Sequence, residues 1–109
     1  MAYDEGLAER IREVLAENPE IREKKMFGGL AFMVQGNMAL GLMTDDLMVR
    51  VGTEEYEKAL LMPHTRKMDL TGRPMKGFII VELEGYEDDR ILKAWINQGL
   101  TYAGSLPAK

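Results

Sequence analysis

The 109-residue sequence contains no cysteine and a single histidine. The lack of cysteine excludes a disulfide framework, a thiolate zinc site, an iron–sulfur cluster and a cysteine nucleophile. The lone histidine, His64, excludes metal binding by two histidines of one chain. It also lacks the serine and aspartate constellation that general-base catalysis would need. Because the sequence offers so few catalytic side chains, we expect neither an enzyme nor a bound cofactor.

Long apolar runs are missing as well. The longest, such as Phe78–Val81, are far too short to cross a bilayer. The first residues mix charges of both signs and lack the apolar core of a signal peptide. We therefore expect a cytoplasmic protein without membrane contact. The acidic pairs Asp45-Asp46 and Asp88-Asp89 are typical of a turn and a helix start, whereas calcium needs a fuller set of oxygen ligands.

Basic residues are outnumbered: 14 Lys and Arg face 18 Asp and Glu, which gives a net charge of −4. This balance disfavours direct binding to nucleic acid, although a local basic patch stays open. An apolar content of 46% is typical of a folded chain rather than a disordered one. The length suits one domain whose core needs neither disulfides nor metal.

Three helices are predicted from apolar spacing and end signals. The first covers about 4–17, with Asp4 as its N-cap and Asn18-Pro19 as its end. The second opens at Thr53 and stops before Pro63. The third spans about 87–103, where Gly99 suggests close packing against a sheet. The residues expected on the apolar faces of the first and third helices are Leu7, Ile11, Val14 and Leu15, then Leu92, Trp95, Ile96, Gly99 and Tyr102.

Short alternating segments predict an antiparallel meander of three or four strands after the first helix. They lie at about 25–27, 30–35, 38–43 and 47–51, with a turn at Gln35-Gly36-Asn37. A further strand over 77–83 is apolar on both faces, which places it inside the sheet. The stretch from Pro63 to Lys76 is expected to be mainly loop. The order α-β(3–4)-α-β(1–2)-α is that of a two-layer α+β fold with an antiparallel sheet packed by helices.

The segment Met26-Phe27-Gly28-Gly29 is the most distinctive motif. Two adjacent glycines allow a sheet corner and the close approach of another backbone. The alternative interpretation is a ligand that approaches bare backbone. The segment does not match a nucleotide-binding motif, because no Gly-x-Gly-x-x-Gly or Gly-Lys-Thr/Ser pattern is present.

A second motif is the locally basic stretch from His64 to Gly77, in which Asp69 is the single acid. It could bind a phosphate, a carboxylate or an acidic partner, or it could be a solvated loop. Arg50, in the middle of a predicted strand, is either a half-buried cation paired to a carboxylate or a solvent-facing residue. The candidate binding residues are therefore Arg50, Arg66, Lys67, Arg73 and Lys76.

The sequence holds nine methionines. Methionine fills irregular cores, and it is also common on adaptable binding surfaces. With a simple meander register, one sheet face would collect Ala31, Met33, Ala39, Gly41, Met43 and Met48, and Met38 would lie on the other face. If helices leave the first face uncovered, it would be a partner site or a homodimer surface.

Taken together, these segments resemble the N-terminal domain of the TfoX/Sxy family of bacterial competence regulators. The resemblance covers nearly the whole chain. The segments that match are Lys25-Met26-Phe27-Gly28-Gly29, Asp46-Leu47-Met48-Val49-Arg50-Val51, Met68-Asp69-Leu70-Thr71-Gly72-Arg73-Pro74-Met75-Lys76-Gly77, the Trp95 helix and Ser105-Leu106-Pro107.

The resemblance implies a two-layer α+β fold like that of secretion-chaperone-type domains. It also implies a role in the transcription of competence genes, together with an activator of the cAMP-receptor type. The regulators carry a second, C-terminal helical domain that has no counterpart up to Lys109. We therefore expect a single TfoX N-terminal-like domain over residues 1–109. The family supplies no catalytic residue to carry over.

Two hypotheses about function follow. The first is a non-enzymatic regulatory module without a cofactor. It binds a protein through the methionine-rich sheet face or the basic loop around Arg73. The alternative is a domain, or an enzyme, that holds a small anion with the Gly28-Gly29 bend, Arg50 and Arg73.

Overall fold

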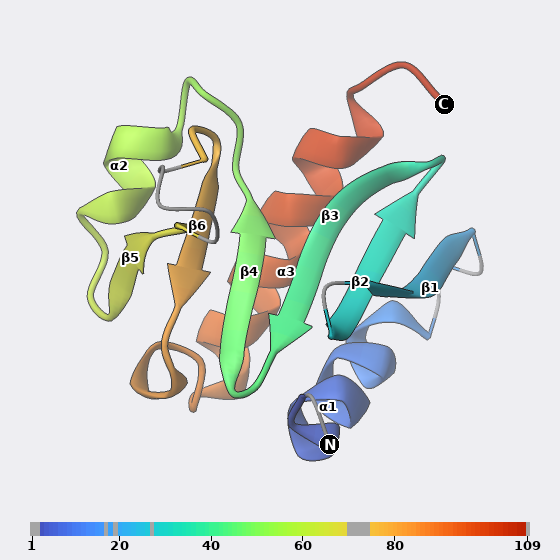
Figure 1. Ribbon diagram of the computed structural model, residues 1–109, viewed down its shortest axis with the longest axis horizontal. Coiled ribbons are helices and arrows are strands. Elements are labelled where there is room, and N and C mark those ends of the chain that lie inside the picture. The colour runs from blue at the N-terminus through green and yellow to red at the C-terminus, as the bar shows by residue number, and fades with distance from the viewer. Residues whose placement is uncertain (1–2, 17, 19, 27, 70–74, 109) are drawn as a thin grey trace.

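One open antiparallel sheet of six strands organises the molecule (Figure 1). The computed structural model describes residues 3–16, 18, 20–26, 28–69 and 75–108. The strands follow the spatial order β1-β2-β3-β4-β6-β5, and every neighbouring pair is antiparallel. Their bounds are β1 (Ile21–Met26), β2 (Gly29–Val34), β3 (Asn37–Met43), β4 (Asp46–Arg50), β5 (Thr65–Lys67) and β6 (Phe78–Val81).

Three α-helices pack on one side of this sheet. They are α1 (Glu5–Leu15), α2 (Tyr56–Leu60) and α3 (Asp89–Gly104), and a short 3-10 helix, η1 (Leu83–Gly85), follows β6. Figure 1 shows α3 behind β3 and β4. The helix–strand order confirms the predicted α+β class. None of the helices in the described ranges is long and apolar enough to span a membrane.

The main core lies between the helices and this side of the sheet. Strand residues alternate into it, so that Leu40 and Leu42 of β3 face inward together with Val49 of β4. From the helices, Ile11 of α1 and Ile96 of α3 pack into the same core, and both are fully buried. Burying such side chains contributes about 1.5–3 kcal/mol each, so this layer supplies most of the hydrophobic stabilisation.

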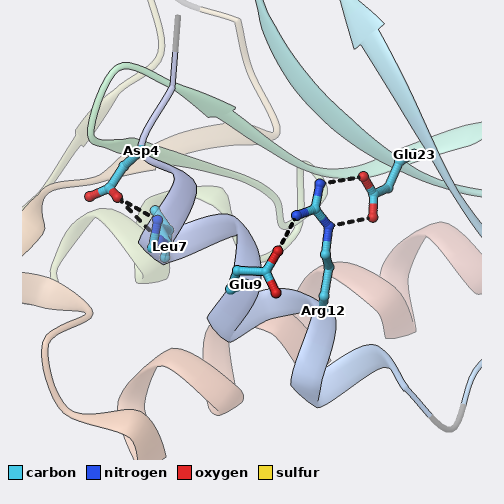
Figure 2. Close-up of polar contacts among 6 residues, drawn as sticks. Asp4, Leu7, Glu9, Arg12 and Glu23 are labelled. Carbon is cyan, nitrogen blue, oxygen red and sulfur yellow. Dashed lines mark hydrogen bonds and ion pairs between the residues drawn. The ribbon is translucent and has the colours of Figure 1, made fainter. Parts of the chain in front are cut away.

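The first helix begins as its sequence predicts. The Asp4 carboxylate accepts hydrogen bonds from the backbone N–H groups of Gly6 and Leu7, and these bonds satisfy donors that a helix start leaves unpaired. Figure 2 shows the Asp4 cap and, further along α1, Arg12 between Glu9 and Glu23. Arg12 donates two hydrogen bonds of 2.8 Å to Glu23. This pair of hydrogen bonds, which we call the fork, connects α1 to β1 and lowers the pKa of Glu23 below its usual value.

The meander departs from the prediction at a β-bulge in β3. Phe32 pairs with Leu40 but Met33 pairs with Met38, so Ala39 is the extra residue. The bulge reverses the alternation, because one additional residue turns the following side chains to the opposite face. Ala39 therefore belongs to the main core, and Met38 joins the other face of the sheet. The predicted faces of Met38 and Ala39 were wrong.

Elements elsewhere in the chain also differ from the prediction. Strand β1 starts at Ile21 rather than Lys25, because its charged residues lie on an edge strand and hide the apolar alternation. Helix α2 starts at Tyr56, and Thr53 lies in the preceding turn instead of capping it. The predicted loop contains β5, a three-residue edge strand paired with β6.

Candidate functional site

The side of the sheet opposite the helices carries a second apolar surface. Its buried members are Met48, Met68 and Ile80, and Met38, Met43 and Phe78 pack on them half-buried. Cross-strand register adds Ala31, Met33 and Gly41, because directly opposed residues point to the same side. We call this set of nine residues the methionine face. None of its members belongs to a helix within the described ranges.

Methionine ends fill the centre of this face. A Cβ built on Gly41 would lie 2.6 Å from the Cε atoms of both Met38 and Met48. The two thioethers therefore fold over the bare glycine and cover the strand. Because methionine is unbranched and changes rotamer easily, this surface can reshape itself against a partner.

Cations surround the methionine face. Register places Arg22 and Lys24 of β1 on this side at one edge of the sheet, opposite Met33 and Ala31. Arg66 lies on the same side at the other edge, opposite Ile80. Arg22 and Lys24 therefore provide positive charge along one edge of this face, in a protein that is acidic overall.

Arg66 is already neutralised. Its guanidinium lies 2.7 Å from the Asp46 carboxylate and 3.1 Å from that of Glu82. These pairs are about half-exposed, so they fix the side chain across β4 and β6 more than they stabilise the fold. Arg66 is therefore occupied within the domain.

Arg50 has a different environment at the end of β4. Its guanidinium carbon lies 5.3 Å from the centre of the Phe78 ring and 5.6 Å from that of Tyr102. Its one hydrogen bond to a described residue is long, at 3.5 Å to the Met38 carbonyl. Across the described part of the chain, no carboxylate lies within ion-pair distance of this cation.

The end of the sheet holds these aromatic rings in place. Val51 and Gly52 donate backbone hydrogen bonds to the Gly77 carbonyl, which anchors the chain leaving β4 beside the start of β6. Gly52 has a φ of 86°, and a Cβ there would lie 2.4 Å from the Tyr102 ring. Only glycine leaves this space open, so Tyr102 can come close enough to reach Arg50.

Of the other predicted cations, Lys76 lies in the exposed turn before Gly77, at the same end of the sheet as Arg50. Met75 is 38% exposed in the same turn. Lys67 lies exposed on the edge strand β5, opposite Ile79. Arg73 lies outside the described residues, together with the motif residues Phe27, Gly72 and Pro74.

The structure separates Gly28-Gly29 from Arg50. Gly28 forms the exposed turn between β1 and β2 at a φ of 74°. A Cβ on Gly29 would lie 2.0 Å from the Leu42 carbonyl oxygen, near the end of β3, whereas Arg50 reaches the Met38 carbonyl near its start. The bare backbone at Gly29 therefore accommodates a neighbouring strand. Met26 ends β1 and pairs with Gly29.

Comparison with known families places these features in one context. The sequence model of the TfoX N-terminal domain matches residues 13–103. The chain belongs to the TfoX N-terminal domain family. A search of curated proteins gave no match. In this TfoX N-terminal domain, the matched range includes all six strands, the methionine face and Arg50. Trp95, a predicted motif residue, lies in α3 and is buried in the main core.

The domain also has a hollow that the sequence did not predict. It lies between α2 and α3, with a volume of about 470 Å³, and Met62, Ile91 and Trp95 line it. Met62 and Ile91 are 50% and 47% exposed. Met62 follows α2 and Ile91 lies in α3, so the hollow is formed by a tertiary contact that no local periodicity reveals. This hollow, the groove between α2 and α3, is a second apolar surface. Substitutions in it can serve as controls for substitutions on the methionine face.

No group of three or more His, Asp or Glu side chains in the described ranges is arranged to hold a metal ion.

Proposed function

We propose that this TfoX N-terminal domain is a non-enzymatic regulatory module that binds an acidic partner protein through its methionine face. The partner would be a transcription activator, as the resemblance to the competence regulators implies, and binding would take place in the cytoplasm. The observation that carries the proposal is the apolar sheet face itself, which lacks a covering helix in the described part of the fold.

An apolar face of this kind has a physical cost when water contacts it. Half-buried methionines and Phe78 surround a buried centre, so a partner would remove further apolar surface from water. Contiguous apolar side chains that stay partly accessible to water are typical of interaction sites on a folded domain. The flexible thioethers of Met38 and Met43 would adapt to the partner without strain in the sheet.

The charges around the face select the chemistry of the partner. Arg22 and Lys24 lie at one edge, and Arg50 lies within the rows of the sheet. Opposite charges across an interface accelerate encounter and discriminate against unsuitable partners. A partner protein whose binding surface has an apolar centre and acidic surroundings would therefore fit this side. A nucleic acid would fit less well, because the protein as a whole is acidic.

The choice of test variant follows from burial. Met48 is 3% exposed, so an aspartate there would bury an unpaired charge and unfold the domain. Met43 is half-buried at the edge of the face, where an aspartate can reach water. Met62, which is 50% exposed in the groove between α2 and α3, provides the matched control.

The experiment compares affinity capture from the source cytoplasm with wild-type, Met43→Asp and Met62→Asp domains, each first shown to be folded by circular dichroism. We expect a partner that the wild type and Met62→Asp retain and that Met43→Asp loses. A partner retained by Met43→Asp, or lost with Met62→Asp alone, would reject the methionine face as the binding surface.

Light scattering on the same three proteins tests the homodimer. A wild-type dimer that Met43→Asp dissociates would make a second copy of this chain the occupant of the face and would contradict an acidic partner there. A wild-type monomer leaves the face available for the proposed partner.

A further inference from the structure

We propose that Arg50 is a receptor for a carboxylate group, held ready by Phe78 and Tyr102, and that the bound partner protein supplies this carboxylate. The source of the carboxylate rests on the proposed function, whereas the receptor itself rests on the geometry around Arg50. Three observations lead to it: unused hydrogen-bond donors, a fixed aromatic support, and a contrast with the other arginines.

The guanidinium of Arg50 has more donors than the described residues use. A guanidinium carries five N–H donors, and the one acceptor among the described residues is the Met38 carbonyl at 3.5 Å. A bond of that length is weak. Because the side chain is half-buried, part of its hydration shell is lost without a compensating anion. An incoming oxyanion would supply the missing interactions.

The aromatic rings hold the cation in one place. Phe78 lies directly opposite Arg50 in the β4–β6 register, and Tyr102 lies against Gly52 at the same end of the sheet. Both ring centres are within the distance at which a cation over a ring is stabilised. A guanidinium that is already oriented loses less entropy when it binds a ligand, which raises its affinity.

Three other arginines of the domain differ from Arg50 because each binds a carboxylate. Arg12 binds Glu9 and Glu23. Arg66 binds Asp46 and Glu82. Arg10 lies over the Tyr86 ring as Arg50 lies over its own rings, but it binds Asp89 at 2.9 Å and two backbone carbonyls. Each of these three arginines therefore has a carboxylate partner, whereas Arg50 has none among the described residues.

A carboxylate matches the site better than other anions. Its two coplanar oxygens fit the parallel N–H groups of a guanidinium, and its single charge equals that of the cation. Arg22, on the same side of the sheet, is three strands away, roughly 14 Å at the ordinary strand spacing. An aspartate, a glutamate or the terminal carboxylate of the partner would therefore bind the Arg50 guanidinium alone, beside the apolar contact on the methionine face.

The receptor can be tested on the domain alone. Side-chain Nε–H signals of arginine are followed by NMR during titration with sodium succinate, and with sodium chloride at the same ionic strength. We expect a saturable shift of the Arg50 signal with succinate that chloride does not reproduce, while the Arg66 signal stays unchanged. Equal shifts at Arg50 and Arg66, or equal effects of the two salts, would overturn the proposal.

Two variants distinguish the geometry of the Arg50 site from its positive charge. Arg50→Lys keeps the cation but loses the paired donors, and we expect succinate to bind roughly tenfold more weakly, judged from the Tyr102 ring signals. Tyr102→Leu keeps Arg50 and removes one support, and it should weaken binding in the same direction. If both variants bind succinate as the wild type does, the geometry at Arg50 is not the receptor. Inorganic phosphate that binds more tightly than succinate would overturn the choice of a carboxylate.

The source of the carboxylate is tested separately, by capture of the partner with Arg50→Lys. Weaker capture than with the wild type supports a carboxylate from the partner, and unchanged capture beside succinate binding overturns this source in favour of a small free anion. If succinate does not bind but capture of the partner still depends on Met43, the carboxylate receptor at Arg50 is rejected and the proposed function is retained. The two proposals therefore fail in distinguishable ways.

Discussion

The α-carbon of Gly99 in α3 faces the backbone of Ala39 in β3, where a methyl group would lie 2.7 Å from the Ala39 carbonyl oxygen. This contact sets how closely the longest helix lies on the sheet behind β3 and β4 (Figure 1). The neighbour is a backbone oxygen that cannot turn aside, and the Leu40 Cδ2 atom is also only 3.0 Å away. The bulge residue and the helix glycine therefore form one close-packed joint.

Gly99→Ala should destabilise the domain because of this joint. Alanine is favoured over glycine inside a helix by about 1 kcal/mol. We expect the clash with Ala39 to outweigh that gain and to lower the free energy of unfolding by about 1–3 kcal/mol in urea denaturation. Gly104→Ala is the matched control, because a Cβ there meets nothing within 4 Å. Equal stabilisation by both substitutions would show that α3 does not need this approach.

The sequence predicted much of the fold because its signals are local. The Asp4 cap, the turn at Gln35 and Gly36, and the buried strand Phe78–Val81 each follow from a few adjacent residues. The bulge at Ala39 carries no such signal, since Met38, Ala39 and Leu40 are all apolar and fit either face. Its position depends on tertiary packing, since the Ala39 backbone lies directly against Gly99 of α3.

The candidate site was predictable only in part for the same reason. The sequence indicated Arg50 and a methionine-rich face, and both lie where alternation in β4 places them. The contact between Arg50 and Tyr102 joins residues that are far apart in the chain, and no periodicity reveals it. The pairing of Arg66 with Asp46 and Glu82 likewise depends on the order of strands β4, β6 and β5.

The fork between Arg12 and Glu23 predicts a dependence of stability on pH (Figure 2). The hydrogen bonds from Arg12 lower the pKa of Glu23 below its usual 4.5. The stabilisation is therefore complete above about pH 4.5, and it is lost as the pH falls through the lowered pKa of the folded protein. Because the Glu23 side chain is 38% exposed, water screens the pair and its value is about 1 kcal/mol or less.

Glu23→Gln should accordingly lower the free energy of unfolding at neutral pH, and its difference from the wild type should shrink toward zero under acid conditions. Urea denaturation at neutral pH and at about pH 3 measures both values. Glu20→Gln serves as the control, since Glu20 is exposed and forms no ion pair with a described residue. A deficit for Glu23→Gln that persists unchanged in acid would refute the role of the ionised carboxylate.

Gly41 should tolerate a methyl group, in contrast to Gly99. The atoms that a Cβ would meet are the flexible ends of Met38 and Met48, which can rotate away at little cost. We expect Gly41→Ala to change the free energy of unfolding by less than about 1 kcal/mol. Gly29→Ala is the comparison, because its Cβ would lie 2.0 Å from the Leu42 carbonyl oxygen and should be far more destabilising. If the two substitutions cost the same, the methionine face is rigid rather than adaptable.

Tyr86 provides the last test, at the alkaline end. It is 1% exposed, and its hydroxyl donates a hydrogen bond to the Asp45 carbonyl. Burial, together with the nearby carboxylates, raises the pKa of Tyr86 from 10.0 to about 12. The raised pKa means that the neutral phenol stabilises the fold below pH 10, and this stabilisation is lost as the pH rises toward 12. Tyr86→Phe should cost about 1 kcal/mol at neutral pH, from the lost hydrogen bond. Between pH 10 and 12 it should lose less stability than the wild type, so the two unfolding free energies should converge. Urea denaturation across this range decides the matter, and parallel curves would show that Tyr86 ionises as freely in the folded protein as in the unfolded chain.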